Sequence, residues 1–196
     1  MRNYFLDTSA LAKRYHKENG SEYMDRVLEQ PGSRSLISNL SIVELESVLA
    51  IKMRTGEINL QSLEIARRRF RADLARQRLL VAPSMNEGHF QSARKLLVRY
   101  GVAEGLRTLD ALQLAMALDL RQMGHITVLV AADQRLCRVA SLTGCSAVNP
   151  SNRALSWFED CTRRVLRGKH VSAGVRTRHA ESVRHITAWH WPARTR

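Results

Sequence analysis

The sequence has little of what marks several common protein classes. Its 196 residues include three cysteines, Cys137, Cys145 and Cys161, and none of them forms a CxxC pair. An odd number of scattered cysteines argues against a disulfide framework, so we expect reduced thiols packed as small apolar groups. Charged residues interrupt every long apolar window, and no charged-then-apolar signal sequence opens the chain. We therefore expect a cytoplasmic protein without a membrane span.

Acidic residues are scarce relative to basic ones. The chain carries 31 Lys and Arg against 18 Asp and Glu, which gives a formal net charge of +13. The excess is uneven, because residues 151–196 alone carry 10 basic against 3 acidic residues. Such a balance favours polyanionic partners, with nucleic acid foremost and acidic proteins as the alternative.

Short apolar runs alternate with helical patterns along residues 1–150. The predicted strands are "NYFLD", "RSLIS", "LLVAP", "HITVLVAAD" and "SAVNP". The predicted helices cover residues 8–30 with a break at Asn19-Gly20, then 39–55, 59–78, 86–100, 108–124 and 134–143. Alternating strands and helices predict an α/β domain, a three-layer α/β/α sandwich with a central, mostly parallel sheet.

The composition and periodicity of the chain change after Pro150. Residues 151–168 are predicted to form a closing helix. Residues 169–196 show no sustained periodicity, and we interpret them as a basic tail that is disordered or foreign to the domain, with an RNA-binding extension as the alternative.

Four acidic residues are predicted to meet at one edge of the sheet. Asp7 and Asp133 end predicted strands, Asp110 lies in the first turn of a helix, and Glu44 lies in the first two turns after the second strand. In a doubly wound sheet, ligands bind beyond the carboxyl ends of the strands. Helix capping or the helix dipole is the alternative explanation for the three aspartates, whereas Glu44 lies inside its helix among apolar neighbours.

Carboxylates gathered in one cleft repel one another, and this repulsion must be offset. Two unit charges about 4 Å apart repel by roughly 4 kcal/mol at an effective dielectric constant near 20. Protonation or a bound cation must relieve this repulsion, and a cluster of oxygens alone suits Mg²⁺, with Mn²⁺ as a substitute, better than zinc. Thr8 and Ser9 could orient a ligand or a metal-bound water, or could simply cap the helix.

A divalent metal beside a basic surface indicates phosphodiester chemistry through an activated water. The sequence has no GxxxxGK[ST] loop, and no glycine-rich turn follows the first strand, which excludes the common nucleotide-binding motifs. A phosphatase of the haloacid-dehalogenase type needs a second Asp two residues after the first, but Ser9 stands at that position.

Four stretches resemble the signature blocks of PIN-domain proteins, in particular the VapC-type toxins of bacterial toxin–antitoxin systems. They are "FLDTSALAKRY", "LISNLSIVELESVL", "LRTLDALQLAMAL" and "VLVAADQRLCRVASLTGCSAVNP", and they lie within residues 3–150 in the family's order. The resemblance implies a PIN-like fold and an endoribonuclease that depends on Mg²⁺ or Mn²⁺.

The resemblance also implies a site and partners. Asp7 and Asp110 would be the most direct metal ligands, Asp133 would lie at the rim or on a water, and Glu44 would hold the metal or the attacking water. The implied partners are an RNA substrate, a VapB-like antitoxin and a second copy of the chain. A catalytically inactive PIN-fold module that binds RNA or protein is the competing interpretation.

Basic side chains supply candidates for RNA binding. Arg107 and Arg135 lie beside predicted site acids, and Arg67 and Arg71 lie on a helix that is locally rich in arginine. Such residues could contact RNA phosphates, or form an ordinary solvated helix face.

Overall fold

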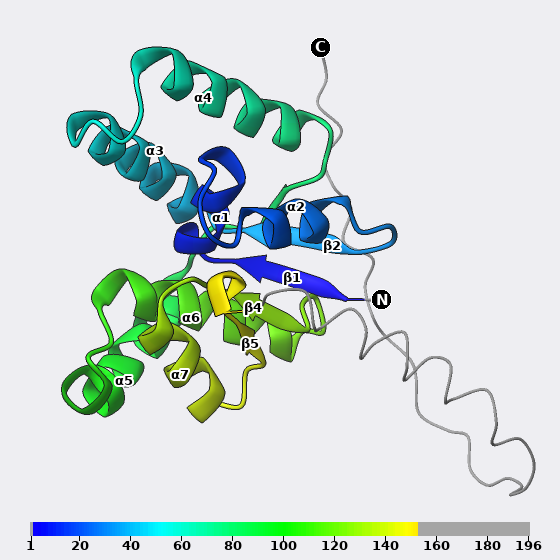
Figure 1. Ribbon diagram of the computed structural model, residues 1–196. Helices are drawn as coiled ribbons and strands as arrows, with labels where there is room; N and C mark the ends of the chain where they lie inside the picture. Colours follow the sequence, from blue (N-terminus) through cyan, green and yellow to red (C-terminus); the bar gives the residue numbers. More distant parts are fainter. Residues whose placement is uncertain (1, 153–196) are drawn as a thin grey trace, which may run out of the picture. The chain divides into compact units, whose positions relative to one another are not determined.

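The fold is built on a parallel sheet, seen in a computed structural model that describes residues 2–152 (Figure 1). The strands are β1 (Asn3–Leu6), β2 (Arg34–Ile37), β3 (Leu80–Val81), β4 (Val128–Val130) and β5 (Ala147–Val148). They lie in the order β3-β2-β1-β4-β5, and each neighbouring pair is parallel. The order reverses between β1 and β4, which is where doubly wound sheets open a crevice for ligands.

Helices cover both faces of the sheet (Figure 1). One layer contains α1 (Thr8–Tyr15), α2 (Ser21–Glu29), α3 (Asn39–Arg54) and α4 (Leu60–Ala75), and the other contains α5 (Glu87–Glu104), α6 (Thr108–Gln122) and α7 (Gln134–Leu142). This arrangement confirms the predicted three-layer α/β/α sandwich. Among residues 2–152, no helix has the length and apolar character needed to cross a membrane.

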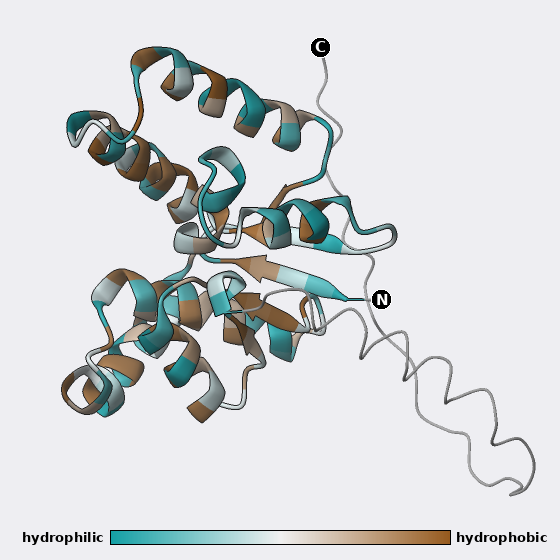
Figure 2. Ribbon diagram, viewed as in Figure 1, coloured by the Kyte–Doolittle hydropathy of each residue, from teal (hydrophilic) through white to brown (hydrophobic). Residues whose placement is uncertain are grey.

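The side chains of the central strands alternate between two hydrophobic cores. In β1, Tyr4 and Leu6 belong to the cluster beneath α1–α4, whereas Phe5 belongs to the cluster beneath α5–α7. In β4, Leu129 lies in the second cluster and its neighbours Val128 and Val130 lie in the first. A strand covered by helices on both faces carries an almost continuous apolar run, visible in brown for β4 in Figure 2.

The structure shortens several predicted elements. The break predicted at Asn19-Gly20 within residues 8–30 is confirmed: α1 and α2 are separate helices, and Gly20 lies between them with a φ of 96°. A Cβ on Gly20 would lie 3.0 Å from the backbone of Pro150, so only glycine fits there without strain. The strand predicted over residues 125–133 is only β4, because the N–H of His125 still bonds to Leu120 at the end of α6.

Other boundaries lie close to the prediction, but α5 continues to Glu104 and ends at Gly105, which has a φ of 66°. Residues 150–152 form a short 3-10 turn. The rest of the predicted closing helix and the tail at 169–196 lie outside the described residues.

A buried ion cluster connects α1 to α4. Arg14 is 7% exposed and Asp73 is 4% exposed, and Nε of Arg14 lies 3.3 Å from Oδ2 of Asp73. The hydroxyl of Tyr15 donates to the same oxygen at 3.1 Å, and Arg14 also pairs with Asp25 on α2. Burial is unfavourable for a charged guanidinium, but these acidic partners outweigh it and raise the pKa of Arg14.

Candidate active site

Two aspartates follow the central strands on either side of the switch in strand order. Oδ2 of Asp7 accepts the N–H of Ser9 at 2.9 Å, and Oδ1 of Asp133 accepts the N–H groups of Arg135 and Leu136 at 2.7 and 3.0 Å. Both side chains therefore cap a helix, as the alternative interpretation predicted. Capping uses one oxygen of each carboxylate, and no described residue donates to the other one. Each aspartate can therefore cap a helix and still offer an oxygen to a ligand.

Asp7 lies deep in the domain, with 4% of its surface exposed. Its burial raises the pKa of this carboxyl from 3.8 to about 6. The hydrogen bonds from Ser9 lower the pKa, whereas the charges of Asp110 and Glu44 raise it further. Asp7 is thus a buried acid among other acids, which is the situation that a bound cation would relieve.

Asp110 lies at the start of α6 and is half-buried. Burial raises its pKa above the ordinary value, and the negative charges of Asp133 and Glu44 act in the same direction. The guanidinium of Arg107, directly before α6, lowers this pKa. The four predicted acids therefore interact electrostatically, although they come from four separate segments of the chain.

Glu44 is held by two donors that reach the same oxygen. Oγ1 of Thr8 lies 2.8 Å and Nε2 of Gln113 lies 2.6 Å from Oε2 of Glu44. Gln113 was not predicted as a site residue, nor were Ser38 and Ser41, which bond to its amide. The only signal in the sequence was an amide inside the apolar run ALQLAMAL, three positions after Asp110.

Ser9 joins the two strand ends. Its hydroxyl donates to Asp7 and accepts the backbone N–H of Ala132 at 2.9 Å. Ala132 directly precedes Asp133, so Ser9 fixes the carboxylate after β1 relative to the loop after β4.

Cys137 lies next to this site on α7. Burial raises the pKa of its thiol to about 11, and the charges of Asp7 and Asp133 contribute to the increase. Its Sγ lies 3.2 Å from the carbonyl oxygen of Ala131, to which the thiol donates. The side chain is therefore a neutral thiol at physiological pH, which makes it a poor nucleophile and a poor metal ligand.

The predicted RNA-binding arginines lie in different surroundings. Arg107 and Arg135 are exposed near the acidic edge. Arg67 on α4 pairs instead with Glu46 at 2.9 Å and Glu64 at 3.0 Å, so nearby acids already compensate its charge. Arg71 is exposed on the same helix as Arg67.

The donor set fits a hard divalent cation. The side chains at this edge offer carboxylate and hydroxyl oxygens, which are the ligands that Mg²⁺ and Mn²⁺ prefer. Within residues 2–152, no group of three or more Asp, Glu, His or Cys side chains is arranged so that it could hold a metal ion. Mg²⁺ commonly binds through one or two carboxylates and keeps several waters, so a partly formed set of protein ligands still fits this ion.

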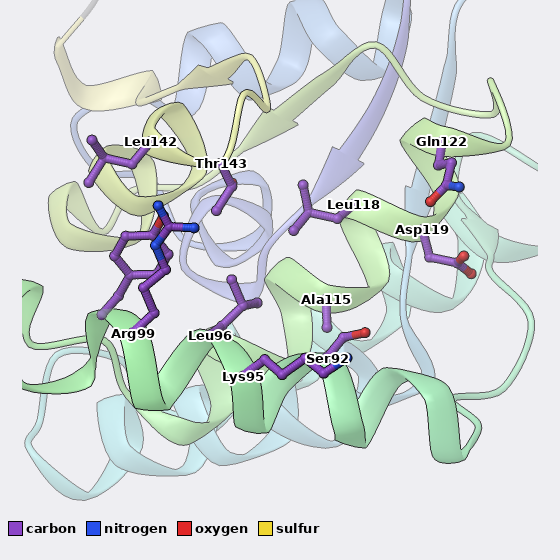
Figure 3. A pocket seen from close by; sticks show the side chains of 11 residues that line it. Ser92, Lys95, Leu96, Arg99, Ala115, Leu118, Asp119, Gln122, Leu142 and Thr143 are labelled. Carbon is purple, nitrogen blue, oxygen red and sulfur yellow. The ribbon is translucent and has the colours of Figure 1, made fainter.

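A pocket of about 490 Å³ lies elsewhere, between α5, the second half of α6 and the end of α7 (Figure 3). Lys95, Arg99, Leu118 and Thr143 are among its lining residues, and none of the four acids is. Asp119 is the only acidic residue that lines this pocket, whereas four acids influence one another at the edge of the sheet, so that edge is the candidate site.

Comparisons with known proteins agree with this fold. The profile of the PIN domain family matches residues 4–142, and no curated protein matches the chain significantly. The sarcin-ricin loop cleaving toxin VapC20 of Mycobacterium tuberculosis is 21% identical, with a TM-score of 0.53 over 75% of this chain and 99% of that one. VapBC2 of Rickettsia felis, solved with a promoter DNA fragment, is 16% identical, with a TM-score of 0.51 over 75% and 98%.

FitAcB of Neisseria gonorrhoeae is a further structural neighbour, 15% identical, with a TM-score of 0.50 over 75% of this chain and 97% of that one. At these identities the solved structures establish the fold, and the family profile covers most of the described domain. The parallel sheet, the helices on both its faces and the matching profile together lead to one conclusion: this chain belongs to the PIN domain family.

Proposed function

We propose that the protein is an endoribonuclease that depends on Mg²⁺ or Mn²⁺, and that it is a VapC-type toxin. The observation that carries this proposal is the interaction of four acids at the switch point of the sheet. Burial and neighbouring negative charge raise the pKa of Asp7 to about 6. The positive charge of a divalent cation would offset both the burial of the Asp7 carboxylate and its repulsion by the neighbouring acids. The structural neighbours also include VapC20, which is described as a toxin that cleaves the sarcin-ricin loop.

In this proposal Asp7 and Asp110 are the direct metal ligands, Asp133 lies at the rim or binds a metal water, and Glu44 holds the metal or the attacking water. When bound, the cation would lower the pKa of a water and neutralise charge that develops on the phosphate. The chain itself positions these oxygens: Ser9 fixes Asp7, and Thr8 fixes Glu44.

RNA would reach the site along a basic surface. The chain has a formal net charge of +13, which favours a polyanion. Arg107 and Arg135 are exposed beside the acids and would contact the phosphates on either side of the scissile bond.

A VapB-like antitoxin is the proposed partner, and the protein is proposed to act as a homodimer. Support for the antitoxin comes from the structural neighbours VapBC2 and FitAcB. A restraining partner is also physically reasonable, because an unrestrained ribonuclease would destroy the RNA of its own cell.

RNA cleavage by the purified protein tests the proposed activity. We expect discrete fragments from total RNA with Mg²⁺ or Mn²⁺ and no fragments with excess EDTA, because the four acids cannot activate a water without the cation. The Asp110→Asn variant should be inactive, whereas Glu22→Gln, which changes an exposed acid on α2, should cleave normally. Wild-type protein that cleaves no RNA even with Mn²⁺ would contradict the proposal and favour an inactive binding module.

Metal binding should depend on pH because Asp7 must lose its proton to bind a cation. With a pKa of about 6, Asp7 is mostly ionised at pH 7 and mostly protonated at pH 5. We expect the apparent affinity for Mn²⁺ to be about tenfold lower at pH 5 than at pH 7. Calorimetry in buffers of different ionisation enthalpy should also detect proton release at pH 6. Equal affinity at both pH values would exclude Asp7 as a titrating ligand.

A further inference from the structure

Gln113 is completely buried in α6, with 0% of its surface exposed. An amide removed from water destabilises a protein unless its polar atoms are hydrogen-bonded. Gln113 avoids this penalty through three partners, and none of them is in its own helix: Ser38, Ser41 and Glu44.

The orientation of the Gln113 amide is fixed by chemistry. Oε2 of Glu44 lies 2.6 Å from Nε2 of Gln113, and a carboxylate oxygen accepts hydrogen bonds, so the amide nitrogen must face it. The second N–H of the amide points to Oγ of Ser41 at 3.0 Å, and the carbonyl oxygen accepts the hydroxyl of Ser38 at 2.8 Å.

The two serines close this network. Their hydroxyl oxygens lie 3.1 Å apart, so Ser41 can donate to Ser38 while Ser38 donates to Gln113. Every hydroxyl and amide proton of the ring then has one acceptor. The amide cannot flip without placing its oxygen against the carboxylate of Glu44, which makes the arrangement rigid.

Glu44 is consequently held through one oxygen only. Thr8 and Gln113 both donate to Oε2, at 2.8 and 2.6 Å, and no described residue donates to Oε1. One oxygen is thus an anchor, and the other remains available to a cation or to the water it carries.

We infer that Gln113 is a positioning residue, which anchors Glu44 so that its second oxygen serves the divalent cation, and that Ser38 and Ser41 set the amide of Gln113. The inference rests on the proposed metal site. It makes three fully buried side chains, Ser38 at the N-cap of α3, Ser41 on α3 and Gln113 on α6, part of the metal-binding machinery rather than of the core alone. Holding a ligand in place in this way usually changes metal affinity by about tenfold or more.

The test compares Mn²⁺ affinity with stability in Gln113→Met, a variant of similar volume that lacks both polar groups. We expect Mn²⁺ binding to the folded protein to weaken by about tenfold, measured by calorimetry. Gln122→Met, an exposed position on the same helix, is the matched control and should bind Mn²⁺ like the wild type. If Gln113→Met lowers the melting temperature but leaves Mn²⁺ affinity unchanged, Gln113 serves the core alone and the inference is wrong.

A double-mutant cycle tests whether Gln113 acts through Glu44. In a Glu44→Ala background, Gln113→Met should weaken Mn²⁺ binding no further, because there is no carboxylate left to anchor. An equal loss in both backgrounds would overturn the inference. If Gln113→Met does not fold, Ser38→Ala is a milder variant. We expect Ser38→Ala to weaken Mn²⁺ binding two- to threefold when Glu44 is present, and to have no effect on it in the Glu44→Ala background.

Failure of the Gln113 inference and failure of the proposed ribonuclease function give different experimental results. Wild-type protein that binds Mn²⁺ but cleaves no RNA would contradict the ribonuclease and still allow the cycle to be measured. Wild-type protein that binds no Mn²⁺ would overturn the inference together with the metal site.

Discussion

Replacing Asp7 with asparagine is expected to abolish RNA cleavage and at the same time to stabilise the metal-free protein. The proposed metal site loses a direct ligand, and a loss of about 4 kcal/mol of transition-state stabilisation corresponds to about a thousandfold in rate. Asparagine keeps a carbonyl oxygen that can accept the N–H of Ser9, so the cap of α1 is retained. The variant therefore shows separately how much the negative charge of Asp7 contributes to RNA cleavage and how much it destabilises the metal-free fold.

The gain in stability follows from the pKa of Asp7. This pKa rises from 3.8 to about 6 on folding, so the folded state binds the proton more tightly than the unfolded chain does. The free energy of unfolding therefore decreases as the pH rises from about 4 to about 6, and the full penalty is present at neutral pH. A shift of this size corresponds to about 3 kcal/mol, which Asp7→Asn should recover in part.

Urea unfolding at pH 7 and at pH 4, with EDTA present, measures the effect. We expect Asp7→Asn to exceed the wild type by about 1–3 kcal/mol at pH 7 and by much less at pH 4, where the wild-type carboxyl is protonated. Added Mn²⁺ should stabilise the wild type and leave Asp7→Asn unchanged. A variant that is less stable than the wild type at pH 7 without metal would show that Asp7 is a favourable structural charge.

Removing the buried carboxylate of Asp73 is expected to have the largest effect on stability. Asp73→Ala leaves the guanidinium of Arg14 without a buried partner and takes away the acceptor of the Tyr15 hydroxyl. Breaking a buried pair by deleting one partner commonly costs about 3–5 kcal/mol, because the remaining charge stays desolvated. Arg14 keeps its contact with Asp25, which is 44% exposed and can compensate only in part.

Urea unfolding of Asp73→Ala beside Glu46→Ala provides the comparison. Glu46 also pairs with an arginine, Arg67, but both side chains are exposed, so we expect a change of less than about 1 kcal/mol. RNA cleavage by the folded fraction of Asp73→Ala should persist, because Asp73 lies outside the acidic edge. Equal losses in the free energy of unfolding of the two variants would mean that burial does not increase the contribution of the Arg14–Asp73 pair to stability.

Both the fold class and the edge of the sheet where the acids gather could be predicted from the sequence because their signals are local. Each apolar run that forms a central strand is a few residues long, and Asp7 and Asp133 directly follow two of them. Parallel strands place their carboxyl ends at the same edge, so the position of these two acids followed from the strand assignment alone. The break at Gly20 was visible as well, although the reason for it, the close approach of Pro150, was not.

The sequence could not indicate which distant side chains would become partners. Gln113 bonds to Glu44 across 69 positions, and Arg14 meets Asp73 across 59. Arg67 illustrates the same limit, because its pairing with Glu46 depends on how α3 and α4 pack.

The sequence by itself therefore determined the class of fold and the edge of the sheet where the acids gather. Only the tertiary structure decided the order of the strands, the burial that raises the pKa of Asp7, and the ring that holds Glu44. The physical reason is that periodicity and capping act within a few residues, whereas burial and hydrogen bonding between helices depend on segments that meet only once the chain has folded.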